Sequence, residues 1–417
     1  MTTRQAENIK NTDEKQRIRV LFVESGTRGR GSFESLYHYL SNVDRDRFEP
    51  QVVVINDTHQ TQRYRDLGIT VNRIPTLLYD REGKEKHPAL WKFMERLAMA
   101  LDLWMPWLTF LTCRLFHSRS MAPLERLIRQ ERIDIVHTNN QPNREFYALW
   151  SAQRAGVPMV AHMRSFCDMG LNQSKQRWIN DHVCRFVPYS QDVADHWTQS
   201  GLDGSRMRVV RNAIGHLTFS PADLQERFGL PENAWIIGMV ATITDFRGHD
   251  LALQALAKIR RDHPDAYLLV IGDGDPEFVS GLQKMAGELK VDDRVIWGGA
   301  HPDGPSLIAS MHALILPYNC EPFGRIVMEA WTVGTAVVLS DVGGIRSIVG
   351  DRENGVIFAA GDSDALADSL TDLIRDDAFR RRLVENGQHY CRENFSITTY
   401  CQQIAAVHEE CLDESSR

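Results

Sequence analysis

Two glutamates with seven residues between them, Glu321 and Glu329, are the side chains whose type and spacing point most directly to chemistry. The apolar segment 313–317 predicts a short buried strand just before them, and the residues from Gly324 onward predict a helix that carries Glu329. Carboxylates accept hydrogen bonds from sugar hydroxyls. The alternative is that both glutamates are solvated on a helix surface, which is the common fate of this residue type.

The start of that predicted helix is suited to an anion. Backbone N–H groups at a helix N-terminus have no partner within the helix, and the helix dipole favours negative charge there. A glycine adds no side chain that would block a phosphate. The residues expected to present these N–H groups are Phe323, Gly324 and Arg325. A carboxylate is therefore expected on each side of a bound diphosphate.

This pattern resembles the glutamate-x7-glutamate motif of the retaining glycosyltransferases of family 4. In that family the glutamate matching Glu321 contacts the transferred sugar, and the glutamate matching Glu329 holds the ribose of the nucleotide. The resemblance implies a UDP-sugar or GDP-sugar donor and retention of the anomeric configuration. It also implies that the acceptor attacks from the face of the leaving group, so that no glutamate acts as a covalent nucleophile.

Two glycine turns follow in the order that the family shows. The apolar strand predicted at 268–271 ends in Gly272 and Gly274, and a second strand at 293–298 contains the next group of candidates. Glycine lets a backbone approach a nucleotide closely, although such a turn also simply ends a strand. The resemblance implies that main-chain groups of the second turn contact the base. The residues concerned are Ile296, Trp297 and Gly298.

A basic residue, Arg247, stands where the family places the second of two cations against the diphosphate. The first of those positions is Thr242, which carries no charge, so Arg325 or Arg164 is expected to replace the missing contact. Two further departures are Arg30, which replaces the first of two adjacent glycines, and Gly215, which replaces an acid. These departures keep open the alternative of a non-catalytic relative that acts as a partner or scaffold.

The amino-terminal half is expected to form the other wall of the site. A glycine-rich turn after the strand 17–24 contains Gly31, before a helix expected to start near Ser32. The resemblance places Gly31 close to the donor phosphates, and it matches His162 to a histidine that faces the reacting sugar. A histidine after a strand is otherwise commonly a structural residue. Arg164 is expected to meet an acceptor phosphate or to form an ordinary surface ion pair.

Length and patterning predict an α/β protein with two doubly wound, Rossmann-like domains, because apolar strands alternate with amphipathic helices in both halves. The resemblance implies the GT-B arrangement, in which the two domains face one another across a cleft and a last helix crosses back to the first. The expected segments are a polar tail at 1–16, an acceptor-side domain at 17–210, a donor-binding domain at 211–395 and the crossover helix at 396–417.

The composition indicates which cellular compartment, partners and cofactors to expect. The seven cysteines show no Cys-x-x-Cys spacing, and the first 16 residues lack the apolar core of a signal peptide, so a reducing cytoplasm is expected. The net charge of −7 and the absence of a basic stripe argue against a nucleic-acid partner. We expect no metal cofactor, because Asp273 and Asp275 fall in a glycine turn that the family explains without one.

The stretch 97–116 is apolar and rich in tryptophan. Asp102 and Pro106 argue against a span, while residues 81–132 carry ten Lys or Arg against six Asp or Glu. This combination fits a segment lying on an anionic membrane. A helix buried against the sheet or at a dimer contact is the alternative.

The sequence thus predicts a retaining glycosyltransferase that uses a nucleotide diphosphate sugar and a glycan or lipid-linked acceptor, such as an intermediate of a cell-surface polysaccharide. A nucleotide-sugar epimerase on the same architecture is a further alternative, which the glutamate motif disfavours. We expect a cytoplasmic protein that associates with the inner face of the membrane.

Overall fold

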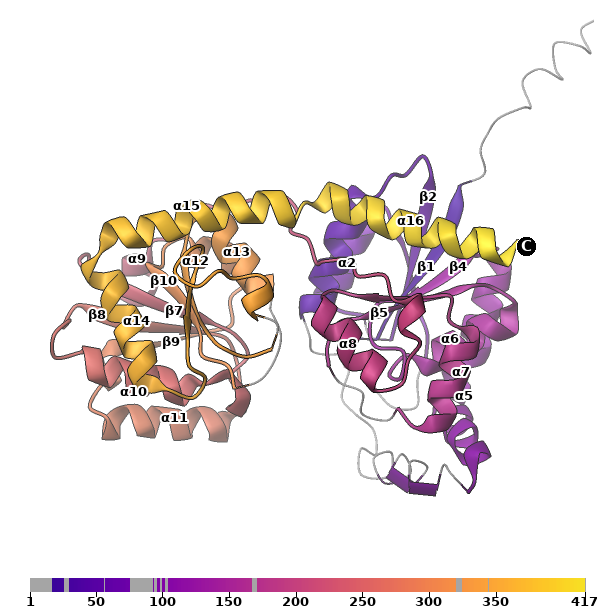
Figure 1. Ribbon diagram of the computed structural model, residues 1–417, viewed down its shortest axis with the longest axis horizontal. Helices are drawn as coiled ribbons and strands as arrows, with labels where there is room; N and C mark the ends of the chain where they lie inside the picture. Colours follow the sequence, from indigo (N-terminus) through magenta and orange to yellow (C-terminus); the bar gives the residue numbers. More distant parts are fainter. Residues whose placement is uncertain are drawn as a thin grey trace, which may run out of the picture. The chain divides into compact units, whose positions relative to one another are not determined.

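The computed structural model divides into two compact units (Figure 1). Unit 1 contains the chain up to Asn212 together with the segment from Ile397, and unit 2 contains Ala213–Ser396. The residues that the structure describes are 17–25, 30–55, 57–75, 93, 96–97, 100–101, 104–166, 171–319, 325–343 and 345–416.

Unit 1 is built on a six-stranded parallel sheet with the strand order β3-β2-β1-β4-β5-β6. The strands are β1 (Ile18–Glu24), β2 (Phe48–Val54), β3 (Thr70–Arg73), β4 (Ile135–Thr138), β5 (Met159–Met163) and β6 (Arg185–Pro188). The helices are α2 (Arg30–Asn42), α3 (His59–Asp66), α5 (Pro106–Gln130), α6 (Phe146–Ala155), α7 (Gln173–His182), α8 (Gln191–Gln199), the short η1 (Gly204–Arg206) and α16 (Ile397–Ser415). Helix α2 begins two residues earlier than the sequence predicts, so that Gly31 lies in its first turn.

Unit 2 repeats this architecture with the strand order β12-β11-β10-β7-β8-β9. Its strands are β7 (Trp235–Val240), β8 (Ala266–Ile271), β9 (Val295–Gly299), β10 (Ala313–Leu316), β11 (Ala336–Ser340) and β12 (Val356–Phe358). Its helices are α9 (Leu224–Phe228), η2 (Asp245–Arg247), α10 (His249–Ile259), α11 (Pro276–Glu288), η3 (Asp292–Arg294), α12 (Gly304–Ile308), α13 (Arg325–Val333), η4 (Ile345–Ser347), α14 (Ser363–Arg375) and α15 (Asp377–Asn394).

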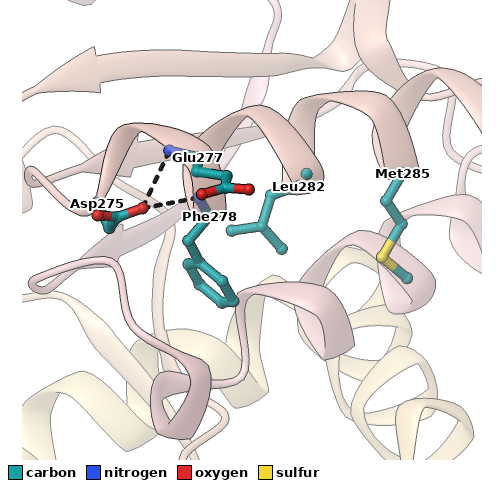
Figure 2. Close-up of a pocket in the computed structure, with 6 residues that line it drawn as sticks. Asp275, Glu277, Phe278, Leu282 and Met285 are labelled. Carbon is teal, nitrogen blue, oxygen red and sulfur yellow. Dashed lines mark hydrogen bonds between the residues drawn. The ribbon is translucent and has the colours of Figure 1, made fainter.

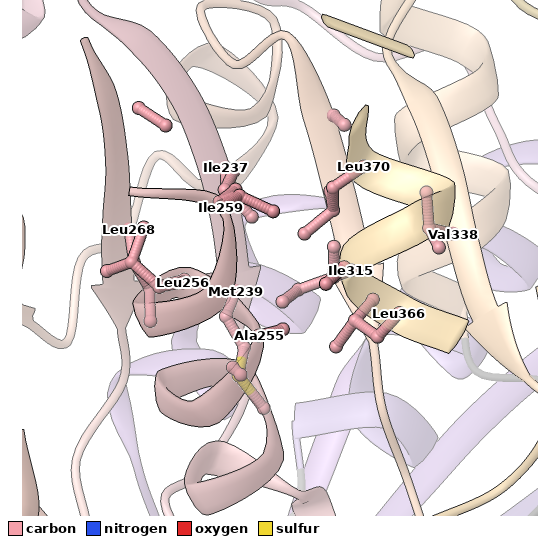
Figure 3. Packing of buried hydrophobic residues seen from close by; sticks show 14 of the residues in the cluster. Ile237, Met239, Ala255, Leu256, Ile259, Leu268, Ile315, Val338, Leu366 and Leu370 are labelled. Carbon is pink, nitrogen blue, oxygen red and sulfur yellow. The ribbon is translucent and has the colours of Figure 1, made fainter. Parts of the chain in front are cut away.

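Both faces of the unit 2 sheet are buried, which explains why its strands read as nearly continuous apolar runs. On one face, side chains such as Ile237, Leu268 and Ile315 pack against α10 and α14 (Figure 3). On the other face, the alternate strand residues pack against α13, whose Trp331 is fully buried. A Cβ at Gly387 of α15 would lie 2.3 Å from the Trp331 ring, so this glycine allows α15 to close over it.

In each sheet the strand order reverses at one point, between β1 and β4 in unit 1 and between β10 and β7 in unit 2. Ligands of open parallel sheets bind beyond the carboxyl ends of the strands at such a point. We therefore expect ligands to bind at the loops after β7 and β10 in unit 2, and near Glu24 and Asn139 in unit 1.

Helix α5 has one buried face and one exposed face. Leu108, Thr112 and Leu124 are buried, and the helix packs on α6. The opposite face exposes Trp107 and Leu111, among others, so burial of the whole segment is excluded for the described residues. None of the helices that the structure describes is long and apolar enough to cross a bilayer.

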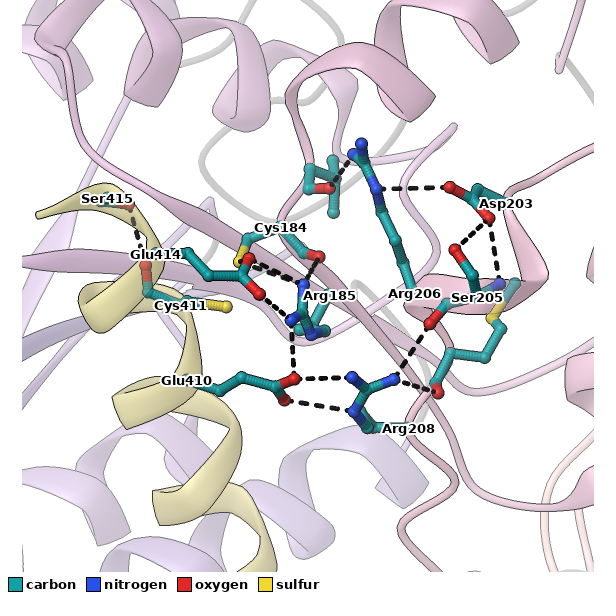
Figure 4. Close-up of polar contacts among 12 residues, drawn as sticks. Cys184, Arg185, Asp203, Ser205, Arg206, Arg208, Glu410, Cys411, Glu414 and Ser415 are labelled. Atoms are coloured by element: carbon teal, nitrogen blue, oxygen red, sulfur yellow. Dashed lines mark hydrogen bonds and ion pairs between the residues drawn. The ribbon is translucent and has the colours of Figure 1, made fainter. Parts of the chain in front are cut away.

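The C-terminal helix α16 belongs to unit 1, where it packs against α2 and β5. Partly buried ion pairs anchor it to the start of β6 (Figure 4). The guanidinium of Arg185, whose side chain is 8% exposed, binds Glu410 at 2.6 Å and also contacts Glu414. Arg208 donates to both oxygens of Glu410, at 2.6 and 3.1 Å. These hydrogen bonds from Arg185 and Arg208 lower the pKa of Glu410 to about 2.

We predict that Glu410→Gln lowers the free energy of unfolding at pH 7 by about 1 to 2 kcal/mol, a figure reduced for the partial exposure of this pair. Because the pKa of Glu410 is depressed in the folded state, its contribution is complete above about pH 4.5 and is lost as the pH falls toward 2. The difference between the variant and the parent should therefore shrink in urea denaturation below that pH.

The matched control is Glu409→Gln, on the neighbouring residue of the same helix, whose partner Arg47 is exposed. It should cost less than about 0.5 kcal/mol. Equal losses from the two variants would contradict a special role for Glu410.

Candidate functional site

Three backbone segments meet at the carboxyl ends of the unit 2 strands. The chain leaving β7 continues beside the turn after β8, where Ala241 N–H donates to Ile271 O and Ile243 N–H donates to Asp273 O at 2.9 Å. The turn after β7 also binds the segment after β10, through Asn319 N–H and Phe246 O at 2.9 Å. The loops that the sequence singled out after β7, β8 and β10 are therefore physically joined.

The glycines of this region are explained by these close approaches. A Cβ on Gly272, whose φ is +149°, would lie 1.9 Å from Ala241 O, and one on Gly274 would lie 2.5 Å from Ile243 O. A Cβ on Gly248 would lie 1.9 Å from Pro317 O. Gly272 and Gly274 are thus required by protein packing, whether or not a nucleotide also approaches them.

Arg247 lies close to two aromatic rings. Its guanidinium carbon is 4.3 Å from the ring centre of Tyr318, after β10, and 4.9 Å from that of Phe246. Stacking of this kind holds a guanidinium in place while it retains its charge. The structure therefore places a cation at the switch point of the unit 2 sheet.

Glu329 and Arg325 lie one turn apart on α13 and form an ion pair, with Arg325 Nε 3.3 Å from Glu329 Oε1. Their side chains are 16% and 9% exposed, respectively. The buried Trp331, whose Nε1 donates to Asn354 O at 2.8 Å, fixes the helix that carries the pair. The other predicted residues of this loop, Glu321, Phe323 and Gly324, lie outside the described residues.

Strand β9 holds the remaining donor-side candidates, Ile296, Trp297 and Gly298, at one edge of the sheet. A Cβ on Gly298 would lie 2.5 Å from Ile271 Cδ1, so this glycine too has a packing reason. The carbonyl oxygen of Gly298 lies 3.0 Å from Nε2 of His301, a contact that the sequence analysis did not foresee.

The two aspartates near these turns serve the protein itself. Asp275 Oδ1 accepts from the N–H groups of Glu277 and Phe278 at the start of α11, and Asp273 Oδ1 accepts from Ala300 N–H. Figure 2 shows the hollow beside α11, which Asp275, Phe278 and Leu282 help to line. No predicted site residue lines it, so it is distinct from the candidate site.

In unit 1, His162 is fully buried and belongs to a row of three histidines. Its Nδ1 lies 3.3 Å from His137 Nε2, and His137 Nδ1 lies 2.9 Å from Nε2 of His408 on α16. Burial lowers the pKa of all three, to about 3 for His408, so each ring is neutral. The row connects the crossover helix to the strand that carries His162.

Arg164 follows His162 at the carboxyl end of β5. Its guanidinium donates to Asn139 O and Oδ1, at 2.8 and 2.7 Å, and to Asn212 Oδ1 at 3.1 Å. Neutral amides thus hold it beside the switch point of the unit 1 sheet, in place of the surface ion pair that the sequence left open. Gly31 lies in the first turn of α2, where a Cβ would have no neighbour within 4 Å.

A buried carboxylate pair also lies at this end of the unit 1 sheet. Asn140 Nδ2 donates to Glu24 at 2.9 Å and to Glu145 at 3.1 Å. Glu145 also accepts from the N–H groups of Ser25 and Asn140, both at 2.9 Å. Burial, and next the neighbouring Glu24, raise the pKa of Glu145 to about 7. The sequence analysis missed this pair, because no local pattern relates residues about 120 positions apart.

Family comparisons agree with this architecture in both units. The family model described as "Glycosyl transferase 4-like domain" matches residues 31–213, and the one described as "Glycosyl transferases group 1" matches residues 222–390. The chain belongs to glycosyltransferase family 4. The expectation drawn from the glutamate motif is confirmed at the level of the family.

The names of similar proteins describe several different activities. The chain is 27% identical to the lipopolysaccharide core biosynthesis glycosyltransferase LpsE of Rhizobium meliloti, over 54% of this chain and 64% of LpsE. It is 28% identical to the N-acetyl-alpha-D-glucosaminyl L-malate synthase of Bacillus anthracis, over 70% of this chain and 78% of that protein. This chain therefore spans under two thirds of the length of LpsE.

Solved structures give the same fold. The crystal structure of Anabaena HepE in complex with UDP and glucose matches with a TM-score of 0.75 and 20% identity, covering 94% of this chain and all of the HepE chain. Sucrose-phosphate synthase from Thermosynechococcus elongatus matches with a TM-score of 0.67 and 16% identity, covering 95% of this chain and all of that one. The predicted GT-B fold, with two Rossmann-like domains, is confirmed.

We predict that Gly272→Ala destabilises unit 2 by about 2 to 4 kcal/mol, because the added Cβ meets Ala241 O and the φ of +149° disfavours a side chain. Thermal unfolding followed by circular dichroism measures this loss. Gly281→Ala is the matched control, since Gly281 lies within α11 and its Cβ would meet nothing within 4 Å. That control should raise stability by about 0.5 to 1 kcal/mol, because alanine favours helix more than glycine does. A neutral Gly272→Ala would remove the packing explanation.

Proposed function

We propose that this protein transfers a sugar from a UDP-sugar or GDP-sugar to an acceptor, with retention of the anomeric configuration. The observation that carries the proposal is the pairing of a stacked cation with a held carboxylate at one switch point. Arg247 lies on the turn after β7, and Glu329 lies on the helix after the neighbouring strand β10. HepE was crystallised with UDP-glucose and with UDP, which supports a UDP-sugar over a GDP-sugar as the donor.

In the proposed complex, the base lies against the main chain at Ile296 to Gly298, and the ribose hydroxyls donate to Glu329. The diphosphate binds Arg247 and the backbone N–H groups of Phe323, Gly324 and Arg325. Glu321 contacts the transferred sugar. Gly272 and Gly274 keep the turn after β8 close to the nucleotide.

Bond cleavage develops negative charge on the departing diphosphate. Fixed donors aimed at that charge stabilise the transition state more than the ground state, which is how binding groups accelerate the step. A phosphate oxygen of the leaving group takes the proton from the acceptor hydroxyl, and the protein supplies no covalent nucleophile. The proposal needs no metal ion.

Thr242 stands where the family usually has a basic residue, so fewer positive charges are available to bind the diphosphate. Each remaining arginine therefore contributes more to that binding. Arg325 has its Nε bonded to Glu329, and it therefore enters the site as half of an ion pair with reduced net charge. Arg247, which stacks against aromatic rings, is the stronger candidate for the developing charge. Arg164, held by amides in unit 1, remains suited to an anionic group on the acceptor.

For the acceptor, we propose a glycan or lipid-linked intermediate of a cell-surface polymer. The names of two relatives support this class: LpsE concerns the lipopolysaccharide core, and a Mycobacterium leprae relative is a phosphatidyl-myo-inositol mannosyltransferase. A lipid-linked acceptor requires a cytoplasmic protein to approach the inner face of the membrane.

The exposed face of α5 supports such an approach. Trp107, Leu111 and Leu115 project from it at helical spacing, and the exposed Trp104 lies just before the helix. Arg114 and Arg119 are exposed on the same segment, and residues 104–119 contain no Asp or Glu. An apolar row flanked by cations binds an anionic lipid surface through both burial and charge.

We predict that UDP raises the melting temperature of unit 2 by about 5 to 10 °C at a hundredfold excess over its Kd. Glu329→Ala should abolish this shift, because it removes the acceptor of the ribose hydroxyls. Glu277→Ala, on the exposed surface of α11, is the control and should keep the shift. GDP and ADP measured in parallel identify the base, and no shift with any of the three would reject the donor site.

We predict that Glu321→Ala lowers turnover of the donor sugar by at least about a hundredfold while UDP affinity changes less than about threefold. The reason is that Glu321 is assigned to the sugar and not to the nucleotide. Turnover is measured by release of UDP from the conjugate that gives the largest thermal shift. Unchanged turnover would refute this role.

We predict that the double variant Leu111→Ser/Leu115→Ser loses most of its sedimentation with vesicles of phosphatidylglycerol and phosphatidylcholine. Each substitution removes an exposed apolar side chain without touching the buried face of α5. Phe219→Ser, at an exposed apolar residue of unit 2, is the matched control and should sediment like the parent. Sedimentation that persists in the double variant would reject this surface.

A further inference from the structure

Two cysteines lie side by side where α16 meets the start of β6. Cys184 immediately precedes β6 and is half-buried, whereas Cys411 lies on α16 and is fully buried. The two side chains interact electrostatically, and Figure 4 shows both within the Arg185 cluster. Cys184 Sγ also lies 3.4 Å from Oε2 of Glu414, which is one turn beyond Cys411 on the same helix.

We propose that Cys184 and Cys411 form a redox-sensitive pair, which a hydroperoxide converts into a disulfide that locks α16 onto β6. The modification is independent of the proposed glycosyl transfer and uses no residue assigned to it. Both cysteines belong to unit 1, so the bond requires no rearrangement between the units.

The chemistry divides between the two thiols according to their surroundings. Cys184 is the more accessible of the two, Arg185 NH1 lies 3.6 Å from its sulfur, and it reacts first, as its thiolate. That thiolate attacks hydrogen peroxide, which gives a sulfenic acid and hydroxide. Cys411 then attacks the sulfenic sulfur, the S–S bond forms, and water leaves. In sum, two thiols and one hydrogen peroxide give one disulfide and two waters.

The environment of Cys411 suits the second role. Its interaction with Cys184, and next its burial, raise the pKa of the Cys411 thiol, so Cys184 reacts first. Conversion of Cys184 to a neutral sulfenic acid removes the first of these causes, and Cys411 can then lose its proton and attack. A resolving cysteine in contact with the first one favours the disulfide over further oxidation.

The other described cysteines have different neighbours. Cys401, on the same helix, faces Tyr39 O, and Cys391 faces Thr332 and Met328 O. Cys113 is buried in unit 1, and its burial raises its pKa to about 12. Within the part of the chain that the structure describes, no other two thiols are recorded in contact.

The experiment uses the full chain, reduced and then freed of reductant, with an equimolar amount of hydrogen peroxide. We expect the titratable thiols to fall by two from the seven of the sequence, and peptide mapping to identify a Cys184–Cys411 link. On a non-reducing gel the oxidised chain should migrate faster, because the bond closes a loop that includes all of unit 2. Dithiothreitol should reverse each change, and the oxidised protein should melt several degrees higher.

Cys184→Ser should abolish the link, the mobility change and the rise in melting temperature, and Cys401→Ser should retain all three. Cys184 is half-buried, so its variant keeps the test valid if Cys411→Ser fails to fold. A link to any other cysteine, a link between two chains, or sulfinic acid at Cys184 with Cys411 still free would overturn the proposal.

Discussion

The candidate site of unit 2 depends on backbone segments that lie closer together than side chains would permit. Gly248 approaches Pro317 O, and Gly272 approaches Ala241 O. These contacts tie the turns after β7, β8 and β10 into one surface, and they hold Arg247 beside Tyr318 after β10. The chemistry is carried by a few polar side chains, but their geometry follows from the absence of a Cβ at these positions.

The core of unit 1 differs from that of unit 2, because it contains buried acidic, amide and histidine side chains as well as apolar ones. Glu24 and Glu145 are buried beside one another, and Asn140 and backbone N–H groups supply their hydrogen bonds. Such networks cost desolvation energy and gain directionality, so they specify one arrangement of the loops that they join. The neutral histidine row does the same for α16.

The parts of this protein that the sequence predicts are those set by neighbours along the chain. Apolar runs indicated the strands, and the spacing of Glu321 and Glu329 led to the family. The row from His162 to His408 joins residues 246 positions apart, and the Arg185–Glu410 pair joins residues 225 apart. No periodicity carries such contacts, because they arise only when the whole chain has folded. The sequence also did not predict why Gly272 and Gly298 must be glycines. Each lies against a residue of another strand or of the turn that follows it, Ala241 for Gly272 and Ile271 for Gly298.

The position of α16 in unit 1 has a consequence for biosynthesis. The helix supplies His408 and Tyr400 to a core that is otherwise built from residues before Asn212. A ribosome must therefore make the whole of unit 2 before unit 1 can be completed, which takes about 10 to 40 s at typical elongation rates. During that interval, the surface around Phe22 and Tyr39 is uncovered on the nascent chain. The cell must protect this apolar surface until the last helix emerges, so a chain truncated near residue 396 is a natural client for chaperones and proteases.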